Sequence, residues 1–326
     1  MTNLKRLRTS VAAASLLCAA ISFAMPAAAD GVIIGFSQAS SNSAHRNTMT
    51  ERNRAYAEKN FTDTKLIITN AEGKTNKQIS DVESLLVQGI QVLMISPQDT
   101  TALSPIIKQA MENGVKVVTL ERGVETPVTL HIGPKNYPIG VKVGEFLKDK
   151  LGGKGNIVEI KGDPAVAPAV ERNKGFRDAI AGSEIKVIAE QHADWDQEKA
   201  LKFMEDTLQR FGPGQIQAVY AHNDNMAFGA LKAIEAAGRG DEGILIVGID
   251  GENGAIRAVM DGKLAATFTY STVAPEGVIA AHALAIAEAK DLLPLGAMTI
   301  EIPATLVTKD NAESLLCTGF GDDPKC

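Results

Sequence analysis

The chain has 326 residues, a formal net charge of −6 and 22% charged residues. This length is enough for one large domain or two smaller ones, each with a substantial core. The acidic balance argues against a nucleic-acid partner, because nucleic acids bind to basic faces.

Residues 1–29 have the pattern of a secretory signal peptide. Three basic residues lie within residues 5–8, residues 11–25 are mainly apolar, and residues 27–29 are small alanines of the kind that a signal peptidase accepts. The apolar run is short for a membrane-spanning helix, which needs about 20 residues. The pattern therefore predicts an exported protein with a cleaved leader, and an uncleaved membrane anchor is the alternative.

Two cysteines, Cys317 and Cys326, lie close together near the end of the chain. In an exported protein such a pair indicates a local disulfide, with two free thiols as the alternative. No C-x-x-C motif is present, so we expect neither a redox nor a metal-binding role for them.

Short runs rich in valine and isoleucine alternate with helical stretches along most of the chain. The expected strands are 32–36, 65–69, 92–95, 116–120, 128–132, 156–160, 186–190, 218–221, 244–249 and 265–269. Between them, residues 78–87, 200–211 and 226–237 have apolar positions at helical spacing. This alternation predicts an α/β fold with parallel sheets covered by helices.

So many strand–helix units fit two doubly wound lobes better than one open sheet. The alternation loosens near Gly133, between residues 270 and 275, and near Pro303, and we expect the chain to cross between lobes there. The expected first lobe is 30–134 plus 271–303, and the second is 135–270 plus 304–326.

Polar side chains follow most of the expected strands, where doubly wound sheets bind their ligands. They include His45, Arg46, Glu121, Arg122, Arg172, Trp195, Asn223 and Asp250. Carboxylate, amide and guanidinium groups form paired hydrogen bonds with neighbouring hydroxyls, and an aromatic face covers the C–H face of a sugar ring. The cluster therefore favours a neutral ligand that is rich in hydroxyl groups.

Each of these residues also has a purely structural interpretation. Asn223 is a suitable N-cap for the helix that follows it, and Asp250 with Gly251 is suitable for a turn. Glu121 and Arg122 are compatible with a surface ion pair, Trp195 with a core aromatic, and Arg172 with a residue that faces water. Their common position after strands is what favours a binding site.

Several stretches carry a resemblance to a known family. They are residues 35–38, 121–122, 171–176, 193–196, 220–227, 248–251 and 260–267. The chain resembles periplasmic sugar-binding proteins of the ribose-binding type, the receptors of ABC importers, and within them most resembles the galactofuranose binders. The resemblance covers essentially all of the chain after residue 29.

The resemblance implies two Rossmann-like lobes, joined by a three-segment hinge, that close on a monosaccharide. Carried over by position, the residues expected to contact sugar hydroxyls are Ser96, Arg122, Arg172, Asn223 and Asp250. Trp195 matches a position where the family stacks an aromatic ring on the sugar. Tyr270 lies near the hinge, where ribose binders have a glutamine. The implied protein is a monomer in the periplasm that delivers its ligand to a membrane permease.

Two departures from the family pattern bear on the ligand. Glu121 stands where the family usually has aspartate, and His45 precedes Arg46 where the galactofuranose binders have tryptophan. Because histidine is smaller and more polar than tryptophan, the pocket is expected to have one aromatic wall where galactofuranose binders have two. Pentoses, other furanoses and short polyols therefore remain possible ligands.

Three other functions compete with transport. An enzyme is disfavoured because no phosphate-binding glycine loop, H-E-x-x-H or G-x-S-x-G motif is present and the histidines lack metal spacing, so we expect no catalytic residue, metal or cofactor. A sugar-responsive repressor would have a DNA-binding segment where residues 1–29 stand. A receptor that signals to a chemotaxis or sensor protein remains open.

Overall fold

A computed structural model of the protein describes residues 31–288, 297–321 and 323–326. The predicted signal peptide, residues 1–29, lies outside the described residues. The fold is that of the unit Val32–Cys326.

The first lobe contains a parallel sheet of six strands in the order β11-β5-β4-β3-β1-β2. Its strands are β1 (Val32–Gln38), β2 (Thr64–Asn70), β3 (Val92–Ile95), β4 (Lys116–Leu120), β5 (Leu130–Gly133) and β11 (Met298–Glu301). Its helices are α1 (Ala44–Asn60), α2 (Thr75–Val87), α3 (Ser104–Glu112) and α9 (Glu276–Glu288).

The second lobe contains a parallel sheet of four strands in the order β7-β6-β8-β9 and a small antiparallel pair, β10 with β12. The strands are β6 (Lys154–Lys161), β7 (Glu184–His192), β8 (Ala218–Ala221), β9 (Leu245–Val247), β10 (Thr267–Phe268) and β12 (Leu306–Val307). The helices are α4 (Asn136–Lys150), α5 (Ala167–Ile180), α6 (Gln197–Arg210), α7 (Asp224–Ala236), α8 (Asn253–Met260) and α10 (Ala312–Leu315).

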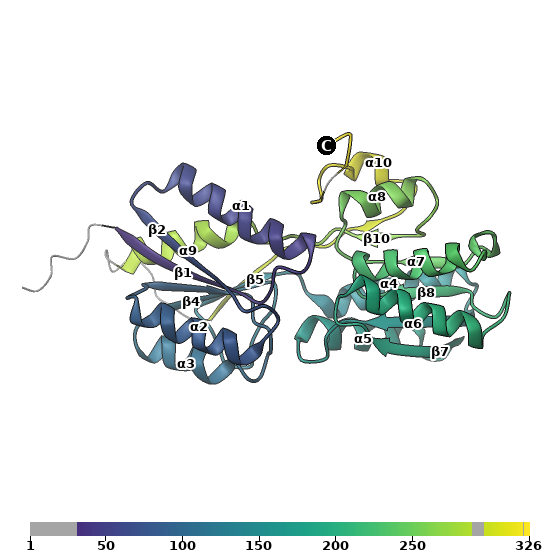
Figure 1. The fold of residues 1–326 in the computed structure, drawn as a ribbon, viewed down its shortest axis with the longest axis horizontal. Helices are drawn as coiled ribbons and strands as arrows, with labels where there is room; N and C mark the ends of the chain where they lie inside the picture. The colour runs from purple at the N-terminus through teal and green to yellow at the C-terminus, as the bar shows by residue number, and fades with distance from the viewer. Residues whose placement is uncertain (1–30, 289–296, 322) are drawn as a thin grey trace, which may run out of the picture. The chain divides into compact units, whose positions relative to one another are not determined.

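Each central sheet has an apolar core on both of its faces. In β3, Met94 packs with α1 and α9 on one face, while Leu93 packs with α2 and α3 on the other (Figure 1). In β8, Val219 packs with α6, α7 and α8, and Tyr220 packs with α4 and α5. Burial on both faces explains why these strands are continuous apolar runs in the sequence.

The chain passes between the two lobes three times: from β5 to α4, from β10 to α9 and from β11 to β12. The prediction of an α/β fold with two parallel-sheet lobes and a three-segment hinge is therefore confirmed. Two details were not predicted. β11 is exposed along its whole length at the sheet edge, and β10 pairs with β12 in an antiparallel sense.

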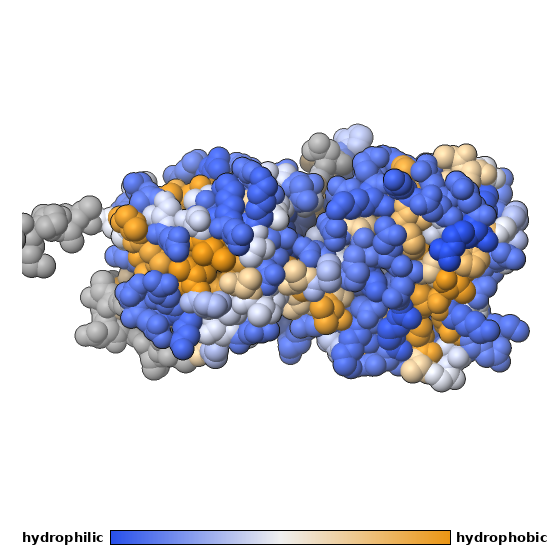
Figure 2. Space-filling model, turned by 60° about the horizontal axis from the view of Figure 1, so that its bottom comes forward, coloured by the Kyte–Doolittle hydropathy of each residue, from blue (hydrophilic) through white to orange (hydrophobic). Residues whose placement is uncertain are grey.

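The face drawn in Figure 2 carries mainly hydrophilic residues, with apolar patches on both lobes. Within the described ranges, no helix has the length and apolar character needed to cross a bilayer. The same ranges contain no group of three histidine, cysteine or acidic side chains that could hold a metal ion.

Candidate ligand-binding site

A pocket lined by both lobes lies beyond the carboxyl ends of their strands. It is partly open to solvent, and its cavity volume is about 30 Å³. Its lining residues are Asn42, Ser43, His45, Arg46, Glu121, Arg122, Arg172, Trp195, Asn223, Asp250 and Tyr270. They follow β1, β4, β7, β8 and β9 or come from α5 and the segment after β10, which is the usual position of ligands in doubly wound sheets.

The start of α1 brings two side chains into the pocket. Ser43 is the N-cap of α1, and its hydroxyl accepts a hydrogen bond from the backbone N–H of Arg46 at 3.3 Å. The buried guanidinium of Arg46 then donates to Ser96 Oγ and to Glu121 Oε2, both at 2.6 Å. Ser96 is fully buried and does not line the pocket, so in this structure its hydroxyl contacts Arg46.

Glu121 is the point where the polar contacts of the first lobe converge. Its carboxylate meets Arg46, lies 3.6 Å from Arg122 Nε and accepts a hydrogen bond from the Tyr270 hydroxyl at 3.1 Å. Burial acts to raise the pKa of Glu121, but the charges of Arg46 and Arg122 outweigh it and lower the pKa to about 2. Glu121 and Arg122 are both buried, so the interpretation as a surface ion pair is wrong.

His45 is a neutral group in the pocket wall. Burial, and after it the charge of Arg46, lowers the pKa of His45 to about 3. Its Nε2 lies 3.4 Å from the carbonyl oxygen of Ser271, and its ring lies 5.7 Å from that of Tyr270. His45 therefore offers the ligand an uncharged aromatic edge at neutral pH.

Arg172 reaches the pocket from α5 with its side chain almost fully buried. Its Nε donates to Asn136 Oδ1 at 2.9 Å, and its Nη1 donates to the carbonyl oxygen of His222. The guanidinium also lies 4.6 Å from the centre of the Tyr270 ring. Because these contacts fix its orientation, Arg172 is a preorganised donor and does not face water.

Trp195 lies close to two guanidinium groups at the pocket. Its ring centre is 5.8 Å from Arg122 Cζ and 5.6 Å from Arg172 Cζ. Gly162 packs against the ring so closely that a Cβ there would lie 2.0 Å from a ring carbon. Within the described part of the chain, Trp195 Nε1 and Arg122 Nε are buried donors without an acceptor.

Asn223 and Asp250 complete the second-lobe side. Asn223 is the N-cap of α7, and its Oδ1 accepts from the backbone N–H of Met226 at 2.9 Å, so the residue both caps a helix and lines the pocket. Burial raises the pKa of Asp250 well above its ordinary value against the attraction of Arg172, and the nearby Asp224 raises it further.

Glu121, Trp195 and Asp250 all have positive φ angles, of 63°, 67° and 135°. Residues other than glycine seldom adopt this region, and such positions concentrate at functional sites. The strands therefore end in strained backbone where they deliver side chains to the pocket.

The structure brings together nine of the ten side chains that the sequence analysis proposed for the ligand. His45, Arg46, Glu121, Arg122, Arg172, Trp195, Asn223, Asp250 and Tyr270 line one pocket, and Ser96 does not. Asn42 and Ser43 also line it, and Asn136 orients Arg172; the sequence analysis missed all three. Asn42 and Ser43 could have been found from the sequence, because a serine three residues before Arg46 is typical of a helix N-cap.

The predicted disulfide pair is joined in the structure. Cys317 and Cys326 have an S–S distance of 2.02 Å and a Cα–Cα distance of 5.3 Å.

Comparison with known proteins places the chain in a family. The model of the periplasmic binding protein domain matches residues 34–291. The ribose import binding protein of Bacillus subtilis is 41% identical over 204 residues, which are 62% of this chain and 65% of that protein. The xylitol-binding protein of Mycolicibacterium smegmatis is 32% identical over 76% of this chain and 70% of that protein.

The solved structures that are similar to this chain include further sugar-binding proteins. The crystal structure of a galactofuranose-binding protein matches with a TM-score of 0.81 and 30% identity, over 88% of this chain and 98% of that one. The fructose-binding periplasmic domain of a hybrid two-component system matches with a TM-score of 0.79 and 32% identity, over 88% of this chain and 94% of that one. The chain therefore belongs to the periplasmic binding protein domain family.

Proposed function

We propose that this chain is a periplasmic solute-binding protein that captures a monosaccharide or short polyol between its lobes and delivers it to an ABC transporter permease. The observation that carries the proposal is the composition of the pocket. Three guanidinium groups, two carboxyl groups, two amides and one indole ring converge there from both lobes. Relatives named for ribose, xylitol and galactofuranose support a ligand of the sugar or polyol class.

The ligand would bridge the two lobes and so favour a closed state. Glu121 and Arg122 would bind its hydroxyl groups from the first lobe, Arg172 and Asp250 from the second, and Trp195 would cover the ring. Arg46, His45, Asn223 and Tyr270 would complete the wall, and Ser96 would act through Arg46. We propose that the ligand leaves chemically unchanged, without a catalytic residue, metal or cofactor.

The proposed lobes are residues 30–134 plus 271–303 and residues 135–270 plus 304–326. Residues 1–29 would be the cleaved signal peptide that directs the protein to the periplasm. We propose that the mature protein acts as a monomer.

The test is a titration of the mature protein, unfolded and refolded to remove carried ligand, against furanoses, pyranoses, pentoses, tetritols and pentitols. A ligand at about 100 times its Kd should stabilise the folded state by about 2.7 kcal/mol, which raises Tm by several degrees. Mass spectrometry of the released ligand should show it unchanged. If no sugar or polyol raises Tm, the proposed ligand class is wrong.

A second candidate function is a sugar receptor for a chemotaxis or sensor protein. The similarity to the periplasmic domain of a hybrid two-component system favours it as the alternative. Uptake of labelled ligand by vesicles that contain the candidate permease and ATPase separates the two functions. Transport requires that uptake depends on this protein, whereas a sensor role predicts uptake that does not.

A further inference from the structure

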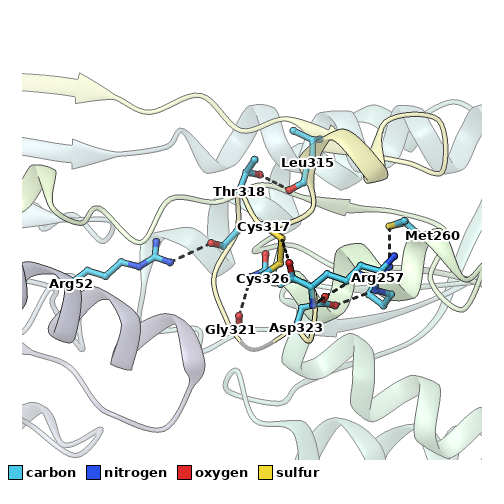
Figure 3. The surroundings of a disulfide bond; sticks show 12 residues. Arg52, Arg257, Met260, Leu315, Cys317, Thr318, Gly321, Asp323 and Cys326 are labelled. Atoms are coloured by element: carbon cyan, nitrogen blue, oxygen red, sulfur yellow. Dashed lines mark hydrogen bonds and ion pairs between the residues drawn. A yellow bond between two sulfur atoms is a disulfide. The ribbon is translucent and has the colours of Figure 1, made fainter.

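The C-terminal loop closed by Cys317 and Cys326 is held by more than its disulfide. Asp323 in this loop pairs with Arg257 of α8, at 3.0 and 3.1 Å between the carboxylate oxygens and the guanidinium nitrogens (Figure 3). The backbone N–H of Cys326 donates to the carbonyl oxygen of Asp323 at 2.9 Å. The loop therefore has a defined position against the second lobe.

The same loop lies directly against the segment that carries Asp250. The backbone N–H of Asn253 donates to the carbonyl oxygen of Phe320 at 2.8 Å, and its side-chain amide donates to that of Gly321 at 2.9 Å. A Cβ on Gly319 would lie 2.0 Å from the carbonyl oxygen of Gly251. Only glycine fits at position 319, so the loop and the pocket segment are in backbone contact.

Phe320 makes the loop's contact with the pocket wall. Its ring is buried, and its centre lies 5.3 Å from that of His45 at an interplanar angle of 71°, an edge-to-face arrangement. Tyr270 contacts the same imidazole at 5.7 Å. His45 is therefore held by two aromatic rings, and only one of them, Tyr270, itself lines the pocket.

Phe320 also lines a neighbouring cavity of about 370 Å³, partly open to solvent, which shares Asp250 and Tyr270 with the binding pocket. Phe320 therefore contacts His45 of the binding pocket and also lines this second cavity. Arg52, on the same helix as His45, donates to the carbonyl oxygen of Gly319 at 3.5 Å (Figure 3). The loop thus contacts the first-lobe helix α1 at two points.

We propose that the disulfide loop is a positioning element of the binding site, in which the Cys317–Cys326 bridge holds Phe320 against His45 and thereby fixes the imidazole in the pocket wall. The inference rests on the proposed function, because it concerns the affinity of the same pocket. Phe320 is a positioning residue: it acts on the ligand through His45.

The test compares ligand affinity by calorimetry in the wild type, Phe320→Ala, His45→Ala and the double variant. Phe320→Ala should weaken binding roughly three- to tenfold, the range expected for loss of an edge-to-face pair. In the His45→Ala background, the same change should have no further effect. Phe320→Tyr, which keeps the ring, should restore at least half of the lost affinity on a logarithmic scale.

The matched control is Phe61→Ala. Phe61 stacks on His282 with ring centres 3.9 Å apart, and neither residue lines the pocket. Loss of this phenylalanine–histidine pair should leave the affinity unchanged. If Phe320→Ala does not fold, Phe320→Leu, which retains apolar volume without a ring, replaces it in the cycle.

The bridge itself is tested with the double variant Cys317→Ser/Cys326→Ser, which should weaken binding, but by less than Phe320→Ala does, because Asp323 and Asn253 also hold the loop. Wild-type affinity in this variant would show that the bridge does not position Phe320. The inference is overturned if the Phe320 variants bind as tightly as the wild type. It is also overturned if Phe320→Ala lowers affinity equally in the wild type and in the His45→Ala background, because Phe320 would then not act through His45. Failure of the wild type to bind any sugar or polyol is a different result and rejects the proposed function.

Discussion

Glu121 shows how one carboxylate organises the first-lobe side of the pocket. It binds Arg46, lies beside Arg122 and accepts from Tyr270, which comes from the chain segment between β10 and α9. Its low pKa means that it stays ionised at neutral pH and balances one of the two nearby guanidinium charges. The ligand therefore meets preoriented donors and acceptors, which favours hydroxyl recognition.

Trp195 is the only tryptophan of the chain and lines the pocket. Ligand binding should therefore change the intrinsic tryptophan fluorescence, and Trp195→Ala should weaken binding at least tenfold through loss of ring stacking. Trp195→Phe should retain part of the affinity. Titration calorimetry checks both variants, and circular dichroism verifies that they fold. Wild-type affinity in Trp195→Ala would remove the residue from the site.

Asp250 is expected to bind hydroxyl groups from the second lobe. Asp250→Ala removes that partner and leaves Arg172 without its nearby carboxyl group, so affinity should fall at least tenfold, with a buried unpaired group costing about 1–3 kcal/mol. The exposed Asp241 on the same lobe is the control, and Asp241→Ala should bind as the wild type does. Wild-type ligand affinity in Asp250→Ala would contradict the assignment of Asp250 to the binding site.

At the scale of elements, the close approach of α4 and α5 positions Arg172. A Cβ on Gly140 would lie 2.2 Å from the Arg172 carbonyl oxygen, and one on Gly175 would lie 2.2 Å from that of Tyr137. Two glycines therefore allow the helices to pack backbone against backbone. The geometry of Arg172 depends on this contact as well as on its own hydrogen bonds.

Gly140→Ala should push α4 away from α5. Overpacking of this kind costs about 1–3 kcal/mol, so Tm should fall by several degrees and affinity should fall with it. The control is Gly212→Ala, because a Cβ there meets no atom within 4 Å. Thermal unfolding and calorimetry measure the two effects. If Gly140→Ala matches Gly212→Ala in both, the helix contact is not what positions Arg172.

Two loops meet across the lobes near the pocket, one after β3 and one after β6. Gln98 Nε2 donates to Asp163 Oδ2 at 2.9 Å, and the backbone N–H of Thr100 donates to the carbonyl oxygen of Ala165 at 2.9 Å. Each side is preoriented: Gln78 Oε1 accepts from the Gln98 N–H at 2.7 Å, and Asp163 Oδ1 accepts from the Ala165 N–H at 2.9 Å. These contacts join the lobes independently of the hinge.

Gln98→Ala should therefore speed ligand release about fivefold, which corresponds to about 1 kcal/mol for one hydrogen bond. In an Asp163→Ala background the same change should add nothing, because the partner is already absent. Thr101→Val is the control, since Thr101 bonds to Glu125 within the first lobe. Stopped-flow fluorescence measures the release rates. Additive effects of Gln98→Ala and Asp163→Ala would show that the two side chains are not coupled.

At the scale of the whole molecule, global stability should depend on the partly buried Glu252. Burial, and after it the charge of Asp224, raises the pKa of Glu252 to about 8 from an ordinary value of 4.5. The folded state therefore binds a proton that the unfolded state has lost at intermediate pH. This contribution is complete below about pH 4.5 and is lost as the pH rises through about 8.

Tm of the wild type should accordingly fall between pH 5 and pH 9, and Glu252→Gln should reduce that fall. Glu313→Gln, at an exposed position on α10, should keep the wild-type pH dependence. Thermal unfolding in matched ionic strength at each pH provides the measurement. Parallel curves for the wild type and Glu252→Gln would rule out titration of Glu252 as the cause.

The sequence by itself determined the fold class, because strands buried on both faces are apolar without interruption. β4 and β8 were predicted with the bounds that the structure has. β11 was missed because all four of its residues are exposed, so its pairing with β5 depends on the neighbouring strand and has no local pattern of burial. Nine proposed binding residues were found by their position after strands or by the family resemblance.

Only the tertiary structure decided which of those side chains line the pocket and which residues orient them. Ser96 follows a strand, as most of the binding residues do, but its hydroxyl accepts a hydrogen bond from Arg46. Asn136 orients Arg172 from another helix. The contact of Phe320 with His45 joins residues that are 275 positions apart in the chain. Local sequence patterns report the burial of a backbone segment, whereas hydrogen-bond partners and ring contacts depend on which distant segments the packed lobes bring together.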